Sequence, residues 1–119
     1  MGLFTLEQAR EQLATLRPLL DEFVALRADA TELGAAVAGA GPSPLGGIPE
    51  LKAVQARMDQ VLTELVATGV EFKGFAPLLM DFPAELHGED VLLCWLEGDD
   101  ELGWYHRVDL GFAGRRPLV

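Results

Sequence analysis

The first third of the chain carries a continuous apolar stripe with helical spacing. Its members recur every three or four residues, which places them on one face of an α-helix. They are Leu6, Ala9, Leu13, Leu16, Leu20 and Phe23, widened by Leu19, Leu26 and Leu33. Ahead of the stripe, Thr5 and Gln8 have the spacing of a capping box. We predict a coiled-coil-like helix over 5–37, kinked or broken near Pro18, because proline removes a backbone hydrogen bond.

A glycine- and proline-rich linker over 38–48 ends this helix and leads to a second one. The second helix is predicted over 49–69, with Pro49 in its first turn and Gly69 as its C-cap. Its stripe consists of Leu51, Val54, Met58, Val61 and Leu65. Two amphipathic helices joined in this way pack antiparallel, so we expect a long helical hairpin.

From residue 70 onward the apolar spacing changes from helical to alternating, which is typical of strands. The expected strands cover 70–72, 78–82, 91–97 and 102–109, with Pro83 closing the second. The predicted fold is therefore α+β: one domain over 1–119, in which the helical hairpin packs with a small C-terminal antiparallel sheet over 70–119.

The turn between the last two strands predicts which side chains share a face of the sheet. Residues 98–101 have the composition of a four-residue hairpin turn. The pairs that follow are Val91–Val108, Leu93–His106 and Trp95–Trp104. In this register Cys94 and His106 project to opposite faces, so we expect no Cys–His nucleophilic site and a structural cysteine instead. A slip of one residue in the register would remove this objection.

The charge of the chain limits its partners. It has 9 basic and 19 acidic residues, a formal net charge of −10. Such a surface repels nucleic-acid phosphates and anionic lipids, so we expect no nucleic acid and no membrane as partner. The opening residues lack a signal-peptide pattern. The single cysteine suits a reducing compartment, and we expect a cytoplasmic protein.

Potential metal ligands are present without a metal-binding spacing. They are His87, His106 and Cys94, with Asp81, Glu85 and Asp109 as neighbours. Zinc sites usually show close ligand pairs such as C-x₂-C, and none occurs here. The acidic run 97–101 lacks the ligand spacing of a calcium loop, and the glycine-rich linker lacks the Gly-Lys-Ser/Thr of a phosphate loop. We therefore predict no metal and no cofactor.

The segment 111–116 is the best local signal for a binding site. Two glycines can turn backbone N–H groups toward an anion, and guanidinium groups bind carboxylate or phosphate. The candidate anion-binding residues are Gly111, Gly114, Arg115, Arg116 and His106, with Trp95 and Trp104 as candidate aromatic lining. The simpler alternative is that both arginines pair with the protein's own carboxylates, and that both tryptophans are core.

The longer first stripe suggests a surface for self-association. If the second helix leaves part of it uncovered, Leu13 and Leu20 are candidate interface residues of a homodimer. Replacing both by Glu would then give a soluble monomer, whereas collapse of the fold would show that they are core.

Several segments together resemble a known bacterial family. They are Phe4–Ala9, Asp81-Phe82-Pro83, Cys94-Trp95-Leu96-Glu97-Gly98, His106 and Gly111–Leu118. In this order they resemble the family catalogued as domain of unknown function 2203, a resemblance that spans nearly the whole chain and implies no activity, cofactor or catalytic residue. We expect a non-catalytic oligomeric interaction or scaffold module, with a protein partner. The alternative is a small anion- or metal-binding protein or enzyme, whose site would combine the 111–116 segment with His106.

Overall fold

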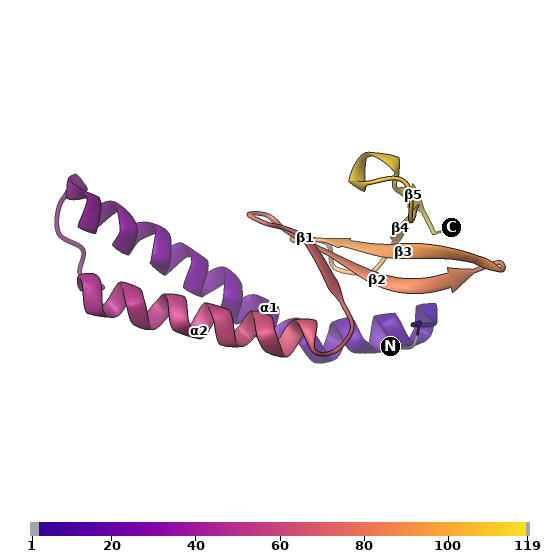
Figure 1. Cartoon of the computed structure of the whole chain (residues 1–119), viewed down its shortest axis with the longest axis horizontal. Helices are drawn as coiled ribbons and strands as arrows, with labels where there is room; N and C mark the ends of the chain where they lie inside the picture. The colour runs from indigo at the N-terminus through magenta and orange to yellow at the C-terminus, as the bar shows by residue number, and fades with distance from the viewer. Residues whose placement is uncertain (1–2, 119) are drawn as a thin grey trace. The chain divides into compact units, whose positions relative to one another are not determined.

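The computed structural model of the protein describes residues 3–118, where two long helices precede an antiparallel sheet (Figure 1). The predicted α+β class is confirmed. Within these residues, no helix is both long and apolar enough to cross a bilayer. The elements in chain order are α1 (Leu6–Ala35), the π-helical turn η1 (Ala36–Ala40), α2 (Ile48–Val66), β1 (Glu71–Phe75), β2 (Leu78–Leu86), β3 (Glu89–Leu96), β4 (Trp104–Arg107), the 3₁₀ turn η2 (Phe112–Gly114) and β5 (Arg116–Pro117).

The chain forms two compact units. The first contains the residues up to Thr15 together with those from Val66 onward, and the second contains Leu16–Leu65. Helix α1 therefore begins in the first unit and continues in the second. The prediction of a single domain stays a prediction.

The predicted capping box is present at the start of α1. The backbone N–H of Gln8 donates to Thr5 Oγ1 over 3.0 Å, and the N–H of Thr5 donates to Gln8 Oε1 over 3.0 Å. These two bonds satisfy donors that a helix N-terminus otherwise leaves unpaired.

We expect Thr5→Ala to lower the free energy of unfolding by about 1 kcal/mol, because it removes the acceptor for the Gln8 N–H. Urea denaturation monitored by circular dichroism measures the change. Thr15→Ala is the matched control, since the Thr15 hydroxyl donates only to the Glu11 carbonyl within the helix. An equal loss of stability in both variants would contradict the role of the cap.

Helix α1 runs through Pro18 as one element, so the break that this proline allowed does not occur. Its apolar stripe faces inward. Leu13 and Leu20, the candidate interface residues, are only 4% and 1% exposed in the single chain. Both side chains are thus already covered by packing within the chain, which favours core, and their place at a dimer interface stays a prediction.

The second unit is an antiparallel helical hairpin. The guanidinium of Arg57 on α2 donates two hydrogen bonds, of 2.6 and 2.8 Å, to the carboxylate of Glu22 on α1. This contact lowers the pKa of Glu22. The connection begins with η1, where Gly39 takes a φ of +101°, a conformation that favours glycine. The Ser43 hydroxyl then donates to Glu32 and anchors the turn to α1.

The sheet of the first unit has the order β1-β2-β3-β4-β5 and is antiparallel throughout. The first turns of α1 lie along one of its faces (Figure 1). That face supplies the core residues Met80, Phe82, Ala84, Val91, Leu93 and Trp95. Alternation along the strands sends Asp81, Cys94 and His106 to the opposite face.

Strand β2 continues past Pro83 to Leu86, so the prediction that Pro83 closes it is wrong. The pairing of β1 with β2 reaches only to Asp81, and beyond that point Phe4 lies beside β2. The Phe4 N–H donates to the Pro83 carbonyl over 2.8 Å, and its ring meets Phe82 edge-on at 5.4 Å. Because Phe4 bridges to β2 at a single position, the absent N–H of Pro83 interrupts no ladder.

The predicted register between β3 and β4 is wrong by one residue. The strands pair Cys94 with Trp104 and Leu92 with His106. Asp99 explains the difference: its carboxylate accepts from the Leu96 N–H (3.0 Å), and its own N–H donates to the Leu96 carbonyl (2.8 Å). This turn ends β3 at Leu96 and delays the next strand. Cys94 and His106 therefore share one face of the sheet.

Candidate functional site

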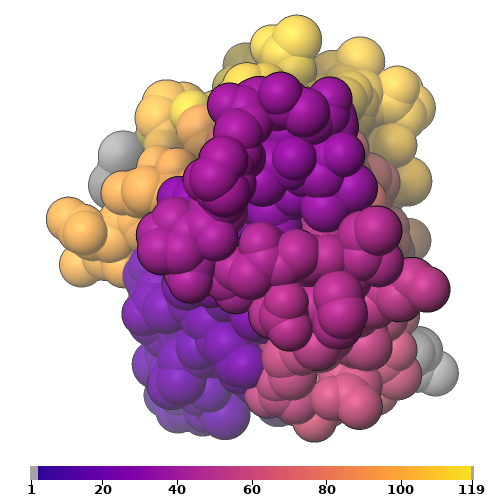
Figure 2. All heavy atoms as spheres, turned by 90° about the vertical axis from the view of Figure 1, so that its left-hand side faces the viewer, coloured from indigo at the N-terminus to yellow at the C-terminus, as the bar shows by residue number. Residues whose placement is uncertain are grey.

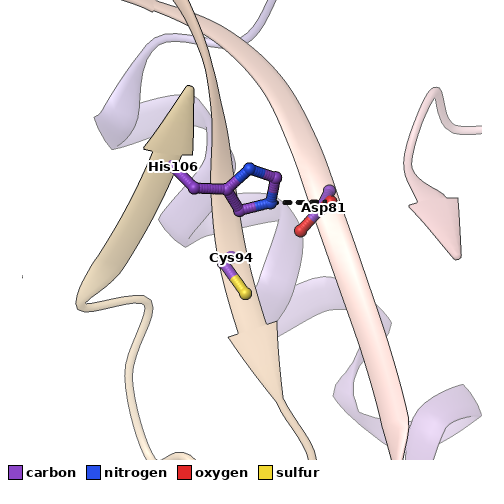
Figure 3. A group of neighbouring side chains, drawn as sticks. All are labelled: Asp81, Cys94 and His106. Atoms are coloured by element: carbon purple, nitrogen blue, oxygen red, sulfur yellow. Dashed lines mark hydrogen bonds and ion pairs between the residues drawn. The ribbon is translucent and has the colours of Figure 1, made fainter. Parts of the chain in front are cut away.

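Three buried side chains of different chemistry converge on the sheet face opposite α1. Asp81 comes from β2, Cys94 from β3 and His106 from β4, and Figure 3 shows them turned toward one another. Asp81 pairs directly with Cys94, while His106 pairs with Leu92, two residues from Cys94 on the same face. Their exposed fractions are 0%, 0% and 3%. We call these residues the Asp–Cys–His cluster.

The histidine is held in one orientation by its backbone. His106 Nδ1 lies 2.8 Å from the Arg107 carbonyl oxygen, and Nε2 lies 3.2 Å from Asp81 Oδ2. A carbonyl oxygen only accepts, so Nδ1 carries a proton and donates it. The side of the ring that can offer a lone pair, Nε2, is thereby directed at the centre of the cluster.

Asp81 has one oxygen that the rest of the described chain leaves unused. Its Oδ2 contacts His106 and lies 3.3 Å from Lys73 Nζ, whereas Oδ1 is buried without a hydrogen-bond partner among residues 3–118. A buried polar atom without a partner is costly and calls for an explanation. Lys73 also binds Glu71 Oε1 over 2.8 Å. Although burial disfavours the ammonium, these two carboxylates raise the pKa of Lys73.

The chemistry of Cys94 does not fit a nucleophile. Burial, with the charge of Asp81 in addition, raises the pKa of the Cys94 thiol to about 11, against a smaller opposing effect of Arg115. A catalytic thiol is activated by the opposite shift. In a catalytic triad, moreover, the two ring nitrogens bind the nucleophile and the carboxylate separately. Here Nδ1 is engaged by the backbone and Nε2 by Asp81, so neither ring nitrogen is left to serve Cys94 as a base. The cluster is not a triad.

The closeness of three ligand types instead points to a shared cation. One ligand atom from each of the three residues lies within 4.8 Å of the others. Two ligands that share a tetrahedral zinc are separated by roughly 3.3 Å, given metal–ligand bonds of about 2.0–2.1 Å for oxygen and nitrogen. The 3.2 Å between His106 Nε2 and Asp81 Oδ2 matches this separation. A donated Nδ1 proton is also the usual outer contact of a metal-binding histidine.

Arg115 lies at the edge of the same face, between two aromatic rings. Its guanidinium carbon is 4.4 Å from the ring centroids of both Trp104 and Phe112. Its Nη1 is 3.9 Å from Asp99 Oδ2 and, within the described residues, lacks a hydrogen-bond partner. Cation–π packing and the more distant Asp99 carboxylate thus hold Arg115. The carboxylate contact agrees with the simpler alternative from the sequence, in which the arginines pair with the protein's own carboxylates.

A pocket of about 440 Å³ opens beside Asp81 and His106. The structure brings together only some of the candidate anion-binding residues at this pocket: Gly111 lines it with His106, whereas Gly114, Arg115 and Arg116 do not belong to its described lining. Of the candidate aromatic residues, Trp104 stacks on Arg115. Trp95 is buried on the other face of the sheet, where its indole N–H donates to the Asp99 carbonyl.

All three residues of the cluster were among the six candidate metal ligands named from the sequence, but they were not combined there. Of these six, Asp81, Cys94 and His106 meet, whereas His87, Glu85 and Asp109 are exposed and stand outside the cluster. The signal that was not used was the setting of Asp81, a carboxylate in an otherwise apolar run over 78–82. Charged side chains are rarely buried unless they are paired.

The fold and the cluster define an α+β protein whose described sheet carries a buried Asp, Cys and His on one face. This chain belongs to the family described as an uncharacterized conserved protein (DUF2203), which matches residues 2–118. The resemblance seen in the sequence motifs is thereby confirmed. No curated protein and no solved structure matches the chain.

Proposed function

We propose that this protein binds a divalent transition metal through Asp81, Cys94 and His106. The observation that carries the proposal is the convergence of a carboxylate, a sulfur and the Nε2 of a backbone-anchored histidine on one buried point. Mixed nitrogen, oxygen and sulfur ligands suit Zn²⁺. The ion would also bind the unused Oδ1 of Asp81. It would replace the direct contact between the buried Asp81 and His106 side chains with a bond from each side chain to the cation.

Three protein ligands leave a fourth tetrahedral position for water or another molecule, which is the arrangement of reactive rather than structural zinc sites. The proposal thus replaces the sequence-based expectation of no metal with its stated alternative, a metal-binding protein. Titration with Co²⁺, a coloured substitute for Zn²⁺, tests it. We expect one ion per chain and a near-ultraviolet sulfur-to-cobalt absorption band. Absence of the band at a saturating Co²⁺ concentration would contradict the proposal.

Metal affinity should rise with pH. The pKa of Cys94 near 11 means that the thiol keeps its proton at neutral pH until an ion displaces it. Release of one proton per ion makes the apparent affinity for Co²⁺ increase roughly tenfold per pH unit between about pH 6.5 and 8. Absorption titrations at several pH values measure the slope. Cys94→Ser has no thiol proton to release, so the increase of Co²⁺ affinity with pH that this proton causes should disappear. An unchanged dependence on pH would show that the released proton comes from another group.

A second candidate function, the oligomeric interaction module, is supported by a different region. We propose that any homodimer forms through the turn end of the helical hairpin, which faces the viewer in Figure 2. There Val37, Leu45 and Ile48 are 45%, 40% and 55% exposed. Native mass spectrometry of the wild type and of Leu45→Glu tests this: a dimer that Leu45→Glu converts to a monomer would support it. A wild-type monomer would exclude it.

A reducing, cytoplasmic location, which the single thiol favours, remains part of the proposal.

A further inference from the structure

We infer that the fourth position of the metal binds a small organic anion, a carboxylate with a short apolar body, which enters through the 440 Å³ pocket. This inference rests on the proposed metal function. Asp81 and His106 belong both to the cluster and to the lining of the pocket, so the pocket gives direct access to the ion. Its volume lies within the range of small-molecule sites, which is roughly 300–1,000 Å³.

The pocket has an apolar wall suited to a short hydrocarbon chain. The wall is formed by side chains from β2 and β3 and from the segment that follows β4: Leu79, Leu92, Val108, Leu110 and Phe112. Val108, Leu110 and Phe112 are 60%, 40% and 39% exposed, and because all three line one pocket they form an exposed apolar patch there. A ligand with an apolar body would cover them.

Lys73 supplies the charge that selects an anion. Asp81 and the Cys94 thiolate neutralise a divalent ion, so the ion alone attracts a further anion only weakly. The Lys73 ammonium has three N–H donors and uses two of them, for Glu71 and Asp81. The third is available to a carboxylate in the pocket. Two acidic side chains besides Asp81 line the pocket, Glu71 and Asp109. Lys73 pairs with Glu71 at 2.8 Å and Arg107 pairs with Asp109 at 2.9 Å, so each repels an anion less than an unpaired carboxylate would.

The test uses the whole of this chain, loaded with Co²⁺, and follows its visible absorption while acetate or butyrate is added. Butyrate should change the spectrum and should bind about tenfold more tightly than acetate, because its additional methylenes are buried against the apolar wall. Lys73→Met should weaken butyrate binding about tenfold, whereas Lys52→Met, which changes an exposed lysine on α2, should not alter it. Since Lys73 touches Asp81, Val108→Glu provides a second variant: it should abolish butyrate binding and leave the affinity for Co²⁺ unchanged.

The outcomes separate this inference from the proposal on which it rests. Failure of the protein to bind Co²⁺ at all overturns the metal function. A Co²⁺ spectrum that neither acid changes overturns the anion site and leaves the metal function in place. Equal affinity for acetate and butyrate overturns the role of the apolar wall, and equal affinity of Lys73→Met and wild type for butyrate overturns the role of Lys73.

Discussion

Cobalt added to the Cys94→Ala protein is expected to give no sulfur-to-cobalt absorption, and the affinity for Zn²⁺ should fall at least about 100-fold. The substitution removes an anionic ligand outright, whereas changing an outer contact of a metal site already costs about 10–100-fold. Asp81→Asn should weaken binding by a similar factor, because the amide keeps the shape of the side chain and loses its charge. Competition against a chromogenic chelator measures both affinities.

Thermal unfolding supplies the control for this experiment. Zn²⁺ should raise the Tm of the wild type, since a ligand that binds only the folded state stabilises it, and should leave the Tm of Cys94→Ala unchanged. Glu85→Gln is the matched control for Asp81→Asn, because Glu85 is an exposed carboxylate on the same strand. Wild-type affinity in both Cys94→Ala and Asp81→Asn would show that the cluster is not the metal site.

Leu20→Glu is expected to destroy the cooperative fold of the helical hairpin rather than release a soluble monomer. Leu20 is 1% exposed, and a glutamate there would bury a charge without a partner. The loss in the free energy of unfolding should exceed about 4 kcal/mol, which is exceptional for one substitution. Circular dichroism during urea denaturation measures it.

Val66→Glu is the matched control, since it places the same charge at a side chain on α2 that is 51% exposed. It should keep the stability of the wild type to within about 0.5 kcal/mol. A folded Leu20→Glu protein that sediments as a monomer while the wild type sediments as a dimer would place Leu20 at a subunit interface.

The helical half of the fold was predictable because its determinants are local. The capping box of Thr5 and Gln8 and the three-four stripe fix α1 without reference to distant residues. The end of α1 was less accurate: the α-helix stops at Ala35 and gives way to η1, where the prediction extended to 37. Pro18 lies on the exposed side of α1, and the helix continues through it although proline removes one backbone hydrogen bond.

The candidate site depended on the pairing of two strands, β3 and β4, which the local sequence pattern does not determine. Alternation puts neighbouring side chains on opposite faces, so a shift of one residue exchanges every inward residue for an outward one. The shift arises from Asp99, whose side chain caps the turn after Leu96. A run of three acidic residues, any of which suits a solvated turn, does not reveal which one will bind the backbone. Cys94 and His106 were therefore assigned to opposite faces, although their chemistry had been recognised.

The division of α1 between two units has a consequence for how chains of this kind can vary. The segment Leu16–Leu65 interrupts the first unit, and Thr15 and Thr68, which lie just before and just after it, line one pocket. The hairpin is in this sense an insertion whose two ends return to one place. Adding or removing the same number of helical turns in α1 and α2 would change the length of the hairpin. The strand register, and with it the Asp–Cys–His cluster, would stay unaltered. The length of the hairpin can thus vary without any change at the centre formed by Asp81, Cys94 and His106.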